Sequence, residues 1–424
     1  MISARDKIIQ VNILRFPRFL QEIKSMKKII RACTVSMSIG FVRGMLPDLN
    51  KKYEVVMLSS PGAEMDEVES KGLARCVVVP MERRISPIKD FISLCKLIKV
   101  FKREKPDMVH SMTPKAGLLC MMAGRLTHVP VRIHTFTGLV WPTAKGLQRK
   151  ILKLTDKITC FCATHIIPEG EGVLNDLRKG GITRKPMKVL GYGNVKGIDM
   201  ERFSRRPEVM ALAMPLRHDD VFTFLFVGRI VGDKGINELV EAFEKLNAEK
   251  PNTRLVLVGR YEDHLDPIYV KTKESINKNP QIEAVGPVFG DDLLAYYAAA
   301  DSFVFPSYRE GFPNTVIEAG AMGLPSIVTD INGSREIITN DNGNDNIKDN
   351  VNVKKNGIII PSKDVKALYE AMKLMVTDDN LRNTMVANAR PMIESRYEQG
   401  FVRKCLYDYY EQVLELKNKK TTNV

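Results

Sequence analysis

Short apolar runs alternate along the chain with longer segments whose apolar residues recur at helical spacing. In the first half, the runs expected to form strands cover residues 28–36, 54–59, 75–79, 108–110, 131–135, 165–167 and 188–190. After a boundary at residues 195–206, a second series covers residues 221–227, 254–258, 282–285, 302–305, 326–328 and 357–360. Alternation of this kind predicts two doubly wound α/β halves, each a parallel sheet with helices on both faces. Ligands are expected at the carboxyl ends of the strands, in the cleft between the halves.

The same pattern predicts the domain limits. Residues 1–25 are expected to be a basic extension, residues 26–203 a first Rossmann-like domain and residues 204–396 a second one. Residues 397–424 are expected to contain a helix that packs back on the first domain, followed by a disordered tail. Residues 340–356, which are rich in Asn, Asp and Gly, are expected to form a mobile surface loop.

The composition narrows the class of protein. With 424 residues, 44% of them hydrophobic, the chain is long enough for two domain cores. It has no apolar run near the ~20 residues of a membrane span, and its N-terminus lacks the pattern of a secretory signal. The seven cysteines are scattered and mostly lie in apolar segments, which predicts reduced thiols in a cytoplasmic protein. Cys160 and Cys162 fit a strand core better than a metal or redox pair.

The net charge of +14 is concentrated in the first half of the chain. A basic half indicates a polyanionic partner, for which the anionic inner leaflet of a membrane and nucleic acid are the two candidates. Residues 87–103 carry an apolar stripe flanked by cations, which suits either a helix on a membrane surface or an ordinary amphipathic helix on the sheet. No aromatic stacking motif or recognition helix accompanies the cations, and this argues against nucleic acid.

Two glutamates, Glu310 and Glu318, are the first candidates for chemistry. Glu310 follows the apolar run 301–307, and Glu318 falls inside the helix predicted after it. Between them, Asn314 or Thr315 offers a side-chain cap for that helix. A helix N-terminus favours an anion such as phosphate, and a carboxylate can accept hydrogen bonds from two vicinal hydroxyls. The two residues therefore fit a sugar-nucleotide site, or else are a solvated glutamate and an ordinary helix glutamate.

A second candidate is the glycine-containing loop after the apolar run 222–227. Gly228 and Arg229 end this run, and Lys234 follows in the sequence Gly-Asp-Lys-Gly. Two cations at the carboxyl end of a strand can stabilise negative charge on a departing phosphate. The chain contains no Asp-x-Asp element and no His/Cys cluster with zinc spacing, so no metal or other cofactor is expected.

The first half contributes weaker candidates. Gly40 and Arg43 follow the first predicted strand and can approach a phosphate or an acceptor, although the GxGxxG spacing of a dinucleotide site is absent. His110 and His134 each end a predicted strand. A histidine at such a place can bind a sugar or move a proton, or it can fill a structural position.

Together these motifs resemble the retaining family 4 glycosyltransferases of the GT-B fold, in which two Rossmann-like domains face each other. The resemblance covers the second half through FVGRIVGDKGINELVEAF, LVLVGR, AAADSFVFPSYREGFPNTVIEAGAMGLPSIVTD, NGSREII and GIIIPSKD. The first half is similar to a capsular or O-antigen polysaccharide subgroup through LSSPGAE, VHSMTPKAGLL, RIHTFTGLVW and VLGYGNVKGIDMERF. The chain departs from many relatives at Thr137-Gly138, where they carry His-Gly, and it lacks the Gly-Gly pair that some relatives have before Gly40.

The resemblance implies roles for the candidate residues. Arg229 and Lys234 would bind the donor diphosphate, Glu318 the ribose hydroxyls, and Glu310 the hydroxyls of the transferred sugar. The implied donor site comprises Gly228, Arg229, Lys234, Gly311, Phe312, Pro313, Asn314, Thr315 and Glu318. The implied catalytic residues are Glu310, His134 and, less readily, His110, and the implied phosphate or acceptor loop contains Gly40 and Arg43.

The implied function is metal-independent transfer of a hexose or N-acetylhexosamine from a nucleotide sugar, with UDP favoured over GDP. The anomeric configuration would be retained without a protein nucleophile. The second domain would bind the nucleotide sugar, and the first a lipid-linked glycan acceptor in bacterial surface polysaccharide synthesis. The enzyme would be cytoplasmic, or peripheral at the inner membrane face. A GT-B-fold nucleotide-sugar epimerase is the alternative enzyme, and a basic nucleic-acid-binding protein is the alternative without enzymatic activity.

Overall fold

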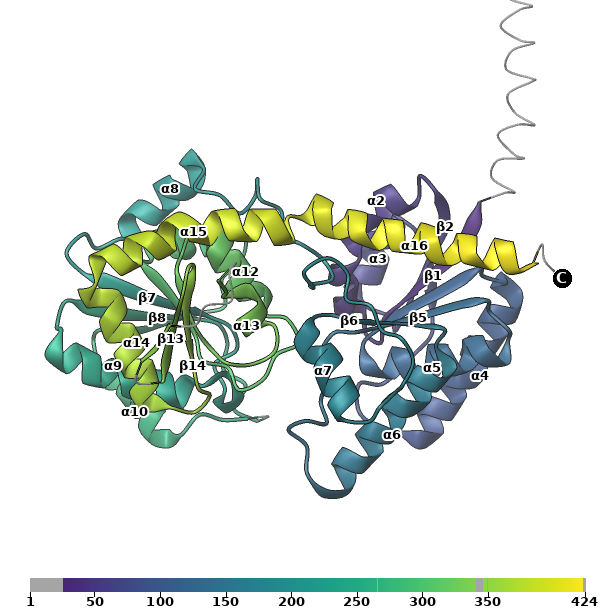
Figure 1. Ribbon diagram of the computed structural model, residues 1–424, viewed down its shortest axis with the longest axis horizontal. Helices are drawn as coiled ribbons and strands as arrows, with labels where there is room; N and C mark the ends of the chain where they lie inside the picture. The colour runs from purple at the N-terminus through teal and green to yellow at the C-terminus, as the bar shows by residue number, and fades with distance from the viewer. Residues whose placement is uncertain (1–25, 265, 341–345, 349, 422–424) are drawn as a thin grey trace, which may run out of the picture.

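The computed structural model describes residues 26–264, 266–340, 346–348 and 350–421. The basic extension expected at the N-terminus lies outside these residues. The described chain folds into two α/β domains that lie side by side, each with a central sheet and helices packed on it (Figure 1). Apolar side chains from both faces of the first sheet form two buried clusters, and those of the second domain form one large cluster.

The first domain is built on six parallel strands in the order β3-β2-β1-β4-β5-β6. The strands are β1 (Lys27–Ala32), β2 (Tyr53–Ser59), β3 (Arg75–Val78), β4 (Met108–Met112), β5 (Val131–Phe136) and β6 (His165–Pro168). The helical segments are η1 (Ser36–Phe41), η2 (Arg43–Met45), α2 (Leu46–Leu49), α3 (Ala63–Ser70), α4 (Pro87–Glu104), α5 (Pro114–Leu126), α6 (Gly146–Cys162) and α7 (Glu171–Lys179). The strand order reverses between β1 and β4, so the loops after these strands open onto a common crevice.

Two strand predictions in this domain are wrong. The run 28–36 is a strand only as far as Ala32, because its last residues turn into η1. Residues 188–190 form no strand, and an isolated bridge between Met187 and Ile166 is the only sheet-like contact there among the described residues.

The cysteine pair of the first domain is also placed differently from the prediction. Cys160 and Cys162 are buried in the last turn of α6, not in a strand. The apolar positions of this segment recur at helical rather than alternating spacing, which explains the difference. All seven cysteines are free thiols.

The second domain has an eight-stranded sheet in the order β12-β13-β14-β11-β10-β7-β8-β9. Its parallel strands are β7 (Phe222–Val227), β8 (Thr253–Val258), β9 (Ile282–Gly286), β10 (Ser302–Phe305), β11 (Ser326–Thr329) and β14 (Gly357–Ile360). The helical segments are α8 (Pro207–Ala213), η3 (Met214–Leu216), η4 (Gly232–Lys234), α9 (Ile236–Glu249), α10 (Val270–Lys278), α11 (Gly290–Ala299), α12 (Asn314–Ala321), α13 (Ser334–Ile337), α14 (Val365–Thr377) and α15 (Asp379–Tyr397).

An antiparallel hairpin extends this sheet where the sequence predicts a mobile loop. Strand β12 (Asn346–Lys348) pairs with β13 (Val351–Lys354), and β13 pairs with β14. Val351 joins the buried cluster of the domain. The prediction of a loop is therefore wrong for these residues: despite its polar composition, the segment forms an edge hairpin that backbone hydrogen bonds hold to the sheet.

The last helix, α16 (Gln399–Thr421), crosses back over the first domain, continuing the line of α15 (Figure 1). Its residues Leu406, Tyr410 and Val413 belong to the apolar cluster on one face of the first sheet. The helix runs into the segment that the sequence predicts to be disordered and ends only at Thr421. None of the described helices, α16 included, is long and apolar enough to cross a membrane.

The chain passes between the domains twice, and the two passages are hydrogen-bonded to each other. The Ile198 N–H donates to the carbonyl oxygen of Tyr397 at 2.8 Å, and the Gln399 N–H donates to that of Ile198 at 2.9 Å. Gly197 makes this approach possible, because a Cβ atom there would lie 2.5 Å from the Cα of Gln399. These paired passages are the hinge between the two domains.

Candidate active site

The cleft between the domains contains two adjoining hollows that share Phe41 and Asn314. The loop pocket, of about 350 Å³, is lined from the second domain by Gly228, Arg229, Lys234, Glu310, Gly311, Phe312, Pro313, Asn314 and Thr315. The hinge pocket, of about 420 Å³, is lined by both domains and by the hinge, and Glu318 faces it. Within the described part of the chain, no group of three or more His, Cys, Asp or Glu side chains is arranged to hold a metal ion.

Lys234 and Glu310 form an ion pair on the wall of the loop pocket. Lys234 ends η4, directly after the loop that follows β7, and Glu310 lies in the loop after β10. The Lys234 ammonium donates to the Glu310 carboxylate, which also accepts from Ser307 Oγ at 2.9 Å. The two side chains are 13% and 18% exposed. A cation and a hydroxyl acceptor therefore stand side by side at the carboxyl end of the sheet.

Arg229 is the second cation of the loop pocket and lies at the end of β7. Its Nη1 donates to Glu262 Oε2 at 2.8 Å, and its side chain remains 42% exposed. The hydrogen bond from Arg229 holds the pKa of the Glu262 carboxyl below its ordinary value. Both cations of this pocket are thus held by carboxylates of their own domain.

Helix α12 begins at the wall of the loop pocket. Its N-cap residue is Pro313, and no side chain caps the helix, so the prediction of a cap from Asn314 or Thr315 is wrong. Asn314 Oδ1 instead accepts a hydrogen bond from Asn194 Nδ2 of the first domain at 3.0 Å. Because the first residues of α12 line the pocket, the positive end of the helix dipole faces it.

Glu318 lies one turn further along α12 and faces the hinge pocket. The Tyr297 hydroxyl donates to Glu318 Oε2 at 3.3 Å. Burial raises the pKa of the Glu318 carboxyl, and the charges of Lys196 and Arg202 oppose this rise. Both cations line the same pocket, which therefore combines a hydroxyl acceptor with positive charge.

Gly40 and Arg43 line the hinge pocket from the first domain, in η1 and η2. Phe41, between them, reaches both hollows. Arg43 is tied to its own domain by an ion pair with Glu67 of α3. The C-terminal helix α16 adds Arg403 to this wall. The loop after the first strand thus faces the side of the second domain that carries Asn314 and Glu318.

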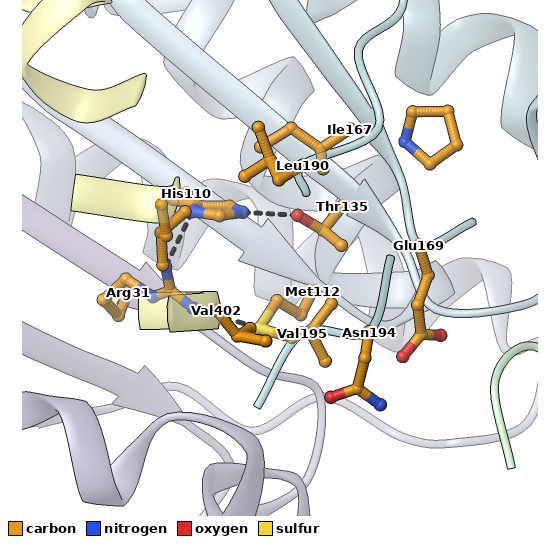
Figure 2. A pocket seen from close by; sticks show the side chains of 12 residues that line it. Arg31, His110, Met112, Thr135, Ile167, Glu169, Leu190, Asn194, Val195 and Val402 are labelled. Atoms are coloured by element: carbon orange, nitrogen blue, oxygen red, sulfur yellow. Dashed lines mark hydrogen bonds between the residues drawn. The ribbon is translucent and has the colours of Figure 1, made fainter. Parts of the chain in front are cut away.

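Contrary to the prediction, His110 does not face the cleft; it lines a separate small chamber of about 20 Å³ (Figure 2). Its Nδ1 lies 2.7 Å from Arg31 Nη1 and 2.5 Å from Tyr410 Oη, and its Nε2 lies 2.7 Å from Thr135 Oγ1. Burial and then the charge of Arg31 lower the pKa of His110 well below its ordinary value. His110 is therefore a neutral structural residue that joins β1, β4, β5 and α16.

His134 is enclosed on the opposite face of the sheet, under α5. Its Nδ1 lies 2.9 Å from Ser111 Oγ, and a Cβ atom on Gly117 would lie 2.4 Å from its Cε1. Burial lowers the pKa of His134 to about 3. The prediction that His134 faces the reacting sugar is wrong, because side chains alternate along a strand and His134 points into the helix layer while Thr135 points the other way.

Polar contacts also join the two domains directly. Glu336 of α13 accepts hydrogen bonds from the backbone N–H groups of Glu171, at 2.7 Å, and Gly172, at 3.0 Å, at the start of α7. Asn332 Nδ2 donates to Asp176 Oδ2 at 2.6 Å. A carboxylate at a helix N-terminus is a favourable arrangement. We call these contacts the latch.

Comparison with known proteins decides the family. Residues 214–392 match the family model of glycosyl transferases group 1, and residues 42–193 match the glycosyl transferase 4-like domain. The chain is 33% identical to the capsular polysaccharide biosynthesis glycosyltransferase CapM of Staphylococcus aureus, over 92% of this chain and 98% of the relative. The chain belongs to this glycosyltransferase family. It is thus a member of a family that makes bacterial capsular and other surface polysaccharides.

A second relative and two solved structures add to this comparison. It is 28% identical, over 81% of its length and 85% of the relative, to the Escherichia coli UDP-Gal:alpha-D-GlcNAc-diphosphoundecaprenol alpha-1,3-galactosyltransferase. The crystal structure of Anabaena HepE with UDP matches 91% of this chain and 100% of that one, with a TM-score of 0.72 and 16% identity. Sucrose-phosphate synthase from Thermosynechococcus elongatus matches with a TM-score of 0.71 and 18% identity, over 92% and 100% of the two chains. The fold of the glycosyltransferase is therefore GT-B.

The structure of the glycosyltransferase also places two further polar residues in the cleft: Thr137, from the Thr137-Gly138 pair noted in the sequence, and Glu169, which no motif singles out. Thr137 and Glu169 line the loop pocket from the first domain, directly after β5 and β6. Glu169 is 4% exposed. Burial, followed by the charges of Glu310 and Glu336, raises its pKa to about 8. Their position just after a strand is the signal that could have found both residues, since ligands of α/β sheets lie there.

Proposed function

We propose that this glycosyltransferase transfers a hexose or N-acetylhexosamine from a UDP-sugar to a lipid-linked glycan acceptor, with retention of the anomeric configuration. The observation that carries the donor assignment is the Lys234–Glu310 pair beside the N-terminus of α12, with Glu318 in the adjoining hollow. Cations and helix N-termini bind phosphate, and carboxylates bind hydroxyls. The UDP complex of HepE supports the choice of nucleotide, and the diphosphoundecaprenol in the name of the Escherichia coli relative supports the acceptor.

Donor binding begins, in this proposal, with an exchange of partners. Arg229 is paired with Glu262, and Lys234 with Glu310. A diphosphate carries more negative charge than one carboxylate, and the α12 N-terminus adds its partial positive charge. We expect the diphosphate to take over both cations. The Glu310 carboxylate then accepts hydrogen bonds from hydroxyls of the transferred sugar.

The nucleoside part of the donor fits the hinge pocket. Glu318 accepts hydrogen bonds from the ribose hydroxyls in this proposal. Phe289, which lines the same pocket and is 78% exposed, offers a ring on which the base can stack. Asn314 lines both hollows and marks the place where the diphosphate joins the two halves of the donor.

The transfer step uses no protein nucleophile. The bond between the anomeric carbon and the β-phosphate oxygen breaks while the acceptor oxygen bonds to that carbon from the same face. The hydroxyl proton passes to the departing phosphate oxygen. Lys234, Arg229 and the helix N-terminus stabilise the negative charge that develops on the diphosphate, which is the part that a metal ion plays in other transferases.

A panel of donors tests this proposal. The protein is incubated with UDP-, GDP- and dTDP-linked hexoses and N-acetylhexosamines, and a short-chain alkyl-diphosphate N-acetylhexosamine serves as acceptor. We expect release of UDP together with a product whose new anomeric centre has the configuration of the donor, as read from its NMR coupling constant. Epimerised donor without product would favour the epimerase instead. Absence of binding to every nucleotide sugar would overturn the donor assignment.

The outer face of the first domain provides a surface suited to a lipid-linked acceptor. Helices α4, α5 and α6 lie next to one another over the sheet (Figure 1). Ile88 and Phe91 of α4 are 78% and 67% exposed, and Leu147 and Leu154 of α6 are 73% and 57% exposed. The cations interleaved with them are Lys89, Lys96, Lys99, Lys102, Arg103, Arg149, Lys150, Lys153 and Lys157. Exposed apolar side chains among cations are typical of helices that lie on anionic bilayers, so we propose that this α4–α6 face contacts the inner leaflet.

Sedimentation with vesicles tests the α4–α6 face. The wild type is expected to bind phosphatidylglycerol-containing vesicles at low salt and to be released by salt, because surface charge attraction is screened. Phe91→Asp should lower the partition coefficient about 10-fold, since it removes apolar area and adds a repelled charge. Val270→Asp, at an equally exposed apolar site of the second domain, is the matched control and should bind normally. Wild-type protein that stays in the supernatant at low salt would contradict the proposal.

A further inference from the structure

Three carboxylates gather where the two domains meet, and two of them have clear partners. Glu310 is held by Lys234, and Glu336 accepts backbone N–H groups at the start of α7. Glu169 lies near enough to both for their charges to act on it. Within the described part of the chain, no residue forms an ion pair with the Glu169 carboxylate or donates a hydrogen bond to it. A buried carboxyl group without a protein partner points to a ligand.

The backbone on both sides fixes Glu169 in place. Its N–H donates to the carbonyl oxygen of Phe136 at 3.0 Å, and its own carbonyl oxygen accepts from the N–H of Asn194 at 2.9 Å. Figure 2 shows the Glu169 carboxylate and the Asn194 amide at one side of the chamber, with His110 and Arg31 at the other. The carboxyl group therefore lies between the chamber and the loop pocket, both of which it lines.

Glu169 and Glu310 line the loop pocket from opposite domains. In the proposed function, the anomeric carbon lies between the diphosphate bound by Lys234 and the sugar hydroxyls bound by Glu310. The acceptor hydroxyl then has to arrive from the wall of the first domain. Gly311 is packed against that domain, since a Cβ atom there would lie 2.3 Å from the carbonyl oxygen of Thr137. The loop that carries Glu310 therefore lies directly against the first domain. Among the first-domain residues that line the loop pocket, Glu169 is the acidic one.

We propose that Glu169 binds the reacting hydroxyl of the acceptor and holds it against the anomeric carbon of the donor sugar. This inference rests on the proposed function. In the transfer, the acceptor oxygen bonds to the anomeric carbon, the bond from that carbon to the diphosphate breaks, and the hydroxyl proton goes to the departing phosphate oxygen. Glu169 keeps its own proton and contributes hydrogen bonds alone.

The protonation state of Glu169 suits this role. Burial, followed by the negative charges of Glu310 and Glu336, raises its pKa to about 8. The two cations of the loop pocket, Lys234 and Arg229, are engaged by Glu310 and Glu262. Below pH 8 the neutral acid accepts a hydrogen bond through one oxygen and donates one through the other. The group recognised is therefore a pair of neighbouring hydroxyls on the acceptor sugar.

The test measures donor and acceptor binding separately. UDP is titrated into the wild type, Glu169→Ala, Glu169→Gln and the control Glu171→Gln, which makes the same change at an exposed position two residues along. A short-chain alkyl-diphosphate N-acetylhexosamine is then titrated into each UDP-saturated protein. We expect UDP to bind all four equally. Acceptor affinity should fall about 10- to 100-fold in Glu169→Ala, fall less in Glu169→Gln and stay unchanged in Glu171→Gln, in keeping with the loss of hydrogen bonds to a buried group.

The outcomes separate this inference from the donor assignment. Normal UDP binding with undiminished acceptor affinity in Glu169→Ala would overturn the role of Glu169 and leave the donor site intact. Weaker UDP binding in Glu169→Ala would make it a donor residue and would also overturn the proposal. A wild type that binds neither UDP nor any UDP-sugar would refute the proposed function, and the inference with it.

Discussion

The candidate charged and polar residues of the two domains differ in where they lie relative to the cleft. On the wall of the second domain, Lys234 at the end of η4 and Glu310 in the loop after β10 are paired with each other and line the loop pocket. In the first domain, His110 and His134 lie within strands, behind the cleft wall, and are each 1% exposed. A polar residue just beyond a strand can face the cleft, whereas one inside the strand faces the helices that cover the sheet.

Glu169 and Thr137 extend this comparison. Both belong to the first domain, and both line the loop pocket because they come after β6 and β5. The first domain therefore also presents polar groups to the cleft: Thr137 lies three residues beyond His134, and Glu169 directly follows the neighbouring strand β6. The five predictions below test this comparison.

The largest effect is expected at Lys234. Lys234→Ala removes the cation that is proposed to stabilise the departing diphosphate, and should lower kcat by about 100- to 1000-fold. Steady-state release of UDP from the productive donor measures this loss. Lys245→Ala, on the exposed side of α9 where Lys245 pairs only with Glu241 among the described residues, should keep wild-type rates. If the kcat of Lys234→Ala stays within a few-fold of the wild-type value, the loop pocket is not where the transfer takes place.

His110→Ala and His134→Ala should instead cost stability. Each removes a buried ring and leaves hydrogen-bonding groups without partners, so we expect the free energy of unfolding to fall by about 2–4 kcal/mol. The kcat of the folded fraction should change little. Urea denaturation followed by fluorescence gives the first quantity, and active-site titration with UDP gives the folded fraction for the second.

The pH profile sharpens the same comparison. Because burial lowers the pKa of His134 to about 3 and that of His110 also falls well below its usual range, neither ring should titrate near pH 6.5 in the folded protein. The contradicting outcome is a step near pH 6.5 in the wild-type kcat profile that disappears in His134→Ala while the stability of the variant stays normal. That result would show that His134 takes part in catalysis.

How far the sequence predicts the molecule follows from the same physics. The strand–helix alternation and the loop motifs around Lys234, Glu310 and Glu318 predict the GT-B fold and bring the candidate donor residues to one cleft, because both depend on local pattern. The surroundings of His110 depend on Tyr410, which α16 brings back from the far end of the chain. No local pattern contains that contact.

The hairpin β12–β13 illustrates a second limit. Its residues are mostly polar, and their order comes from backbone hydrogen bonds to β14, which a composition rule for loops does not register. The same holds for the cap of α12, where Asn314 is used by Asn194 across the domains. Long-range pairing overrides local propensity at each of these points.

Ionisation of the buried Glu169 carboxyl group is expected to destabilise the folded protein at alkaline pH. Its pKa is raised from 4.5 to about 8 in the folded protein, so the folded state binds the extra proton. The stability that this provides is complete below the unfolded value and is lost as the pH rises through the folded one. As the pH rises from 5 to 9, the free energy of unfolding of Glu169→Gln should therefore rise relative to that of the wild type by about 1–3 kcal/mol, because Gln does not ionise.

Thermal unfolding at both pH values measures this gain. The difference in melting temperature between Glu169→Gln and wild type should be small at pH 5 and clearly positive at pH 9. Glu171→Gln should follow the wild type at both, since Glu171 is exposed. A difference that does not grow with pH would mean that Glu169 is already ionised at pH 5, with a cation beside it.

The smallest effect is expected at the latch, where one wall meets the other. Glu336 accepts from the Glu171 N–H through Oε2 and from the Gly172 N–H through Oε1. Because Gln has a single acceptor oxygen, Glu336→Gln loses one of these two hydrogen bonds together with the negative charge at the N-terminus of α7. The charge contributes about 0.3–1 kcal/mol and the hydrogen bond about 0.5–1.5 kcal/mol, so the domains should separate more often. Hydrogen exchange at the Gly172 amide should speed up about 3- to 30-fold, in keeping with these energies, while amides inside β7 keep their rates. Glu394→Gln, an exposed change on α15, should leave the Gly172 amide as it is. Unchanged exchange in Glu336→Gln would show that packing around Gly311 and the paired hinge, rather than the latch charge, hold the walls together.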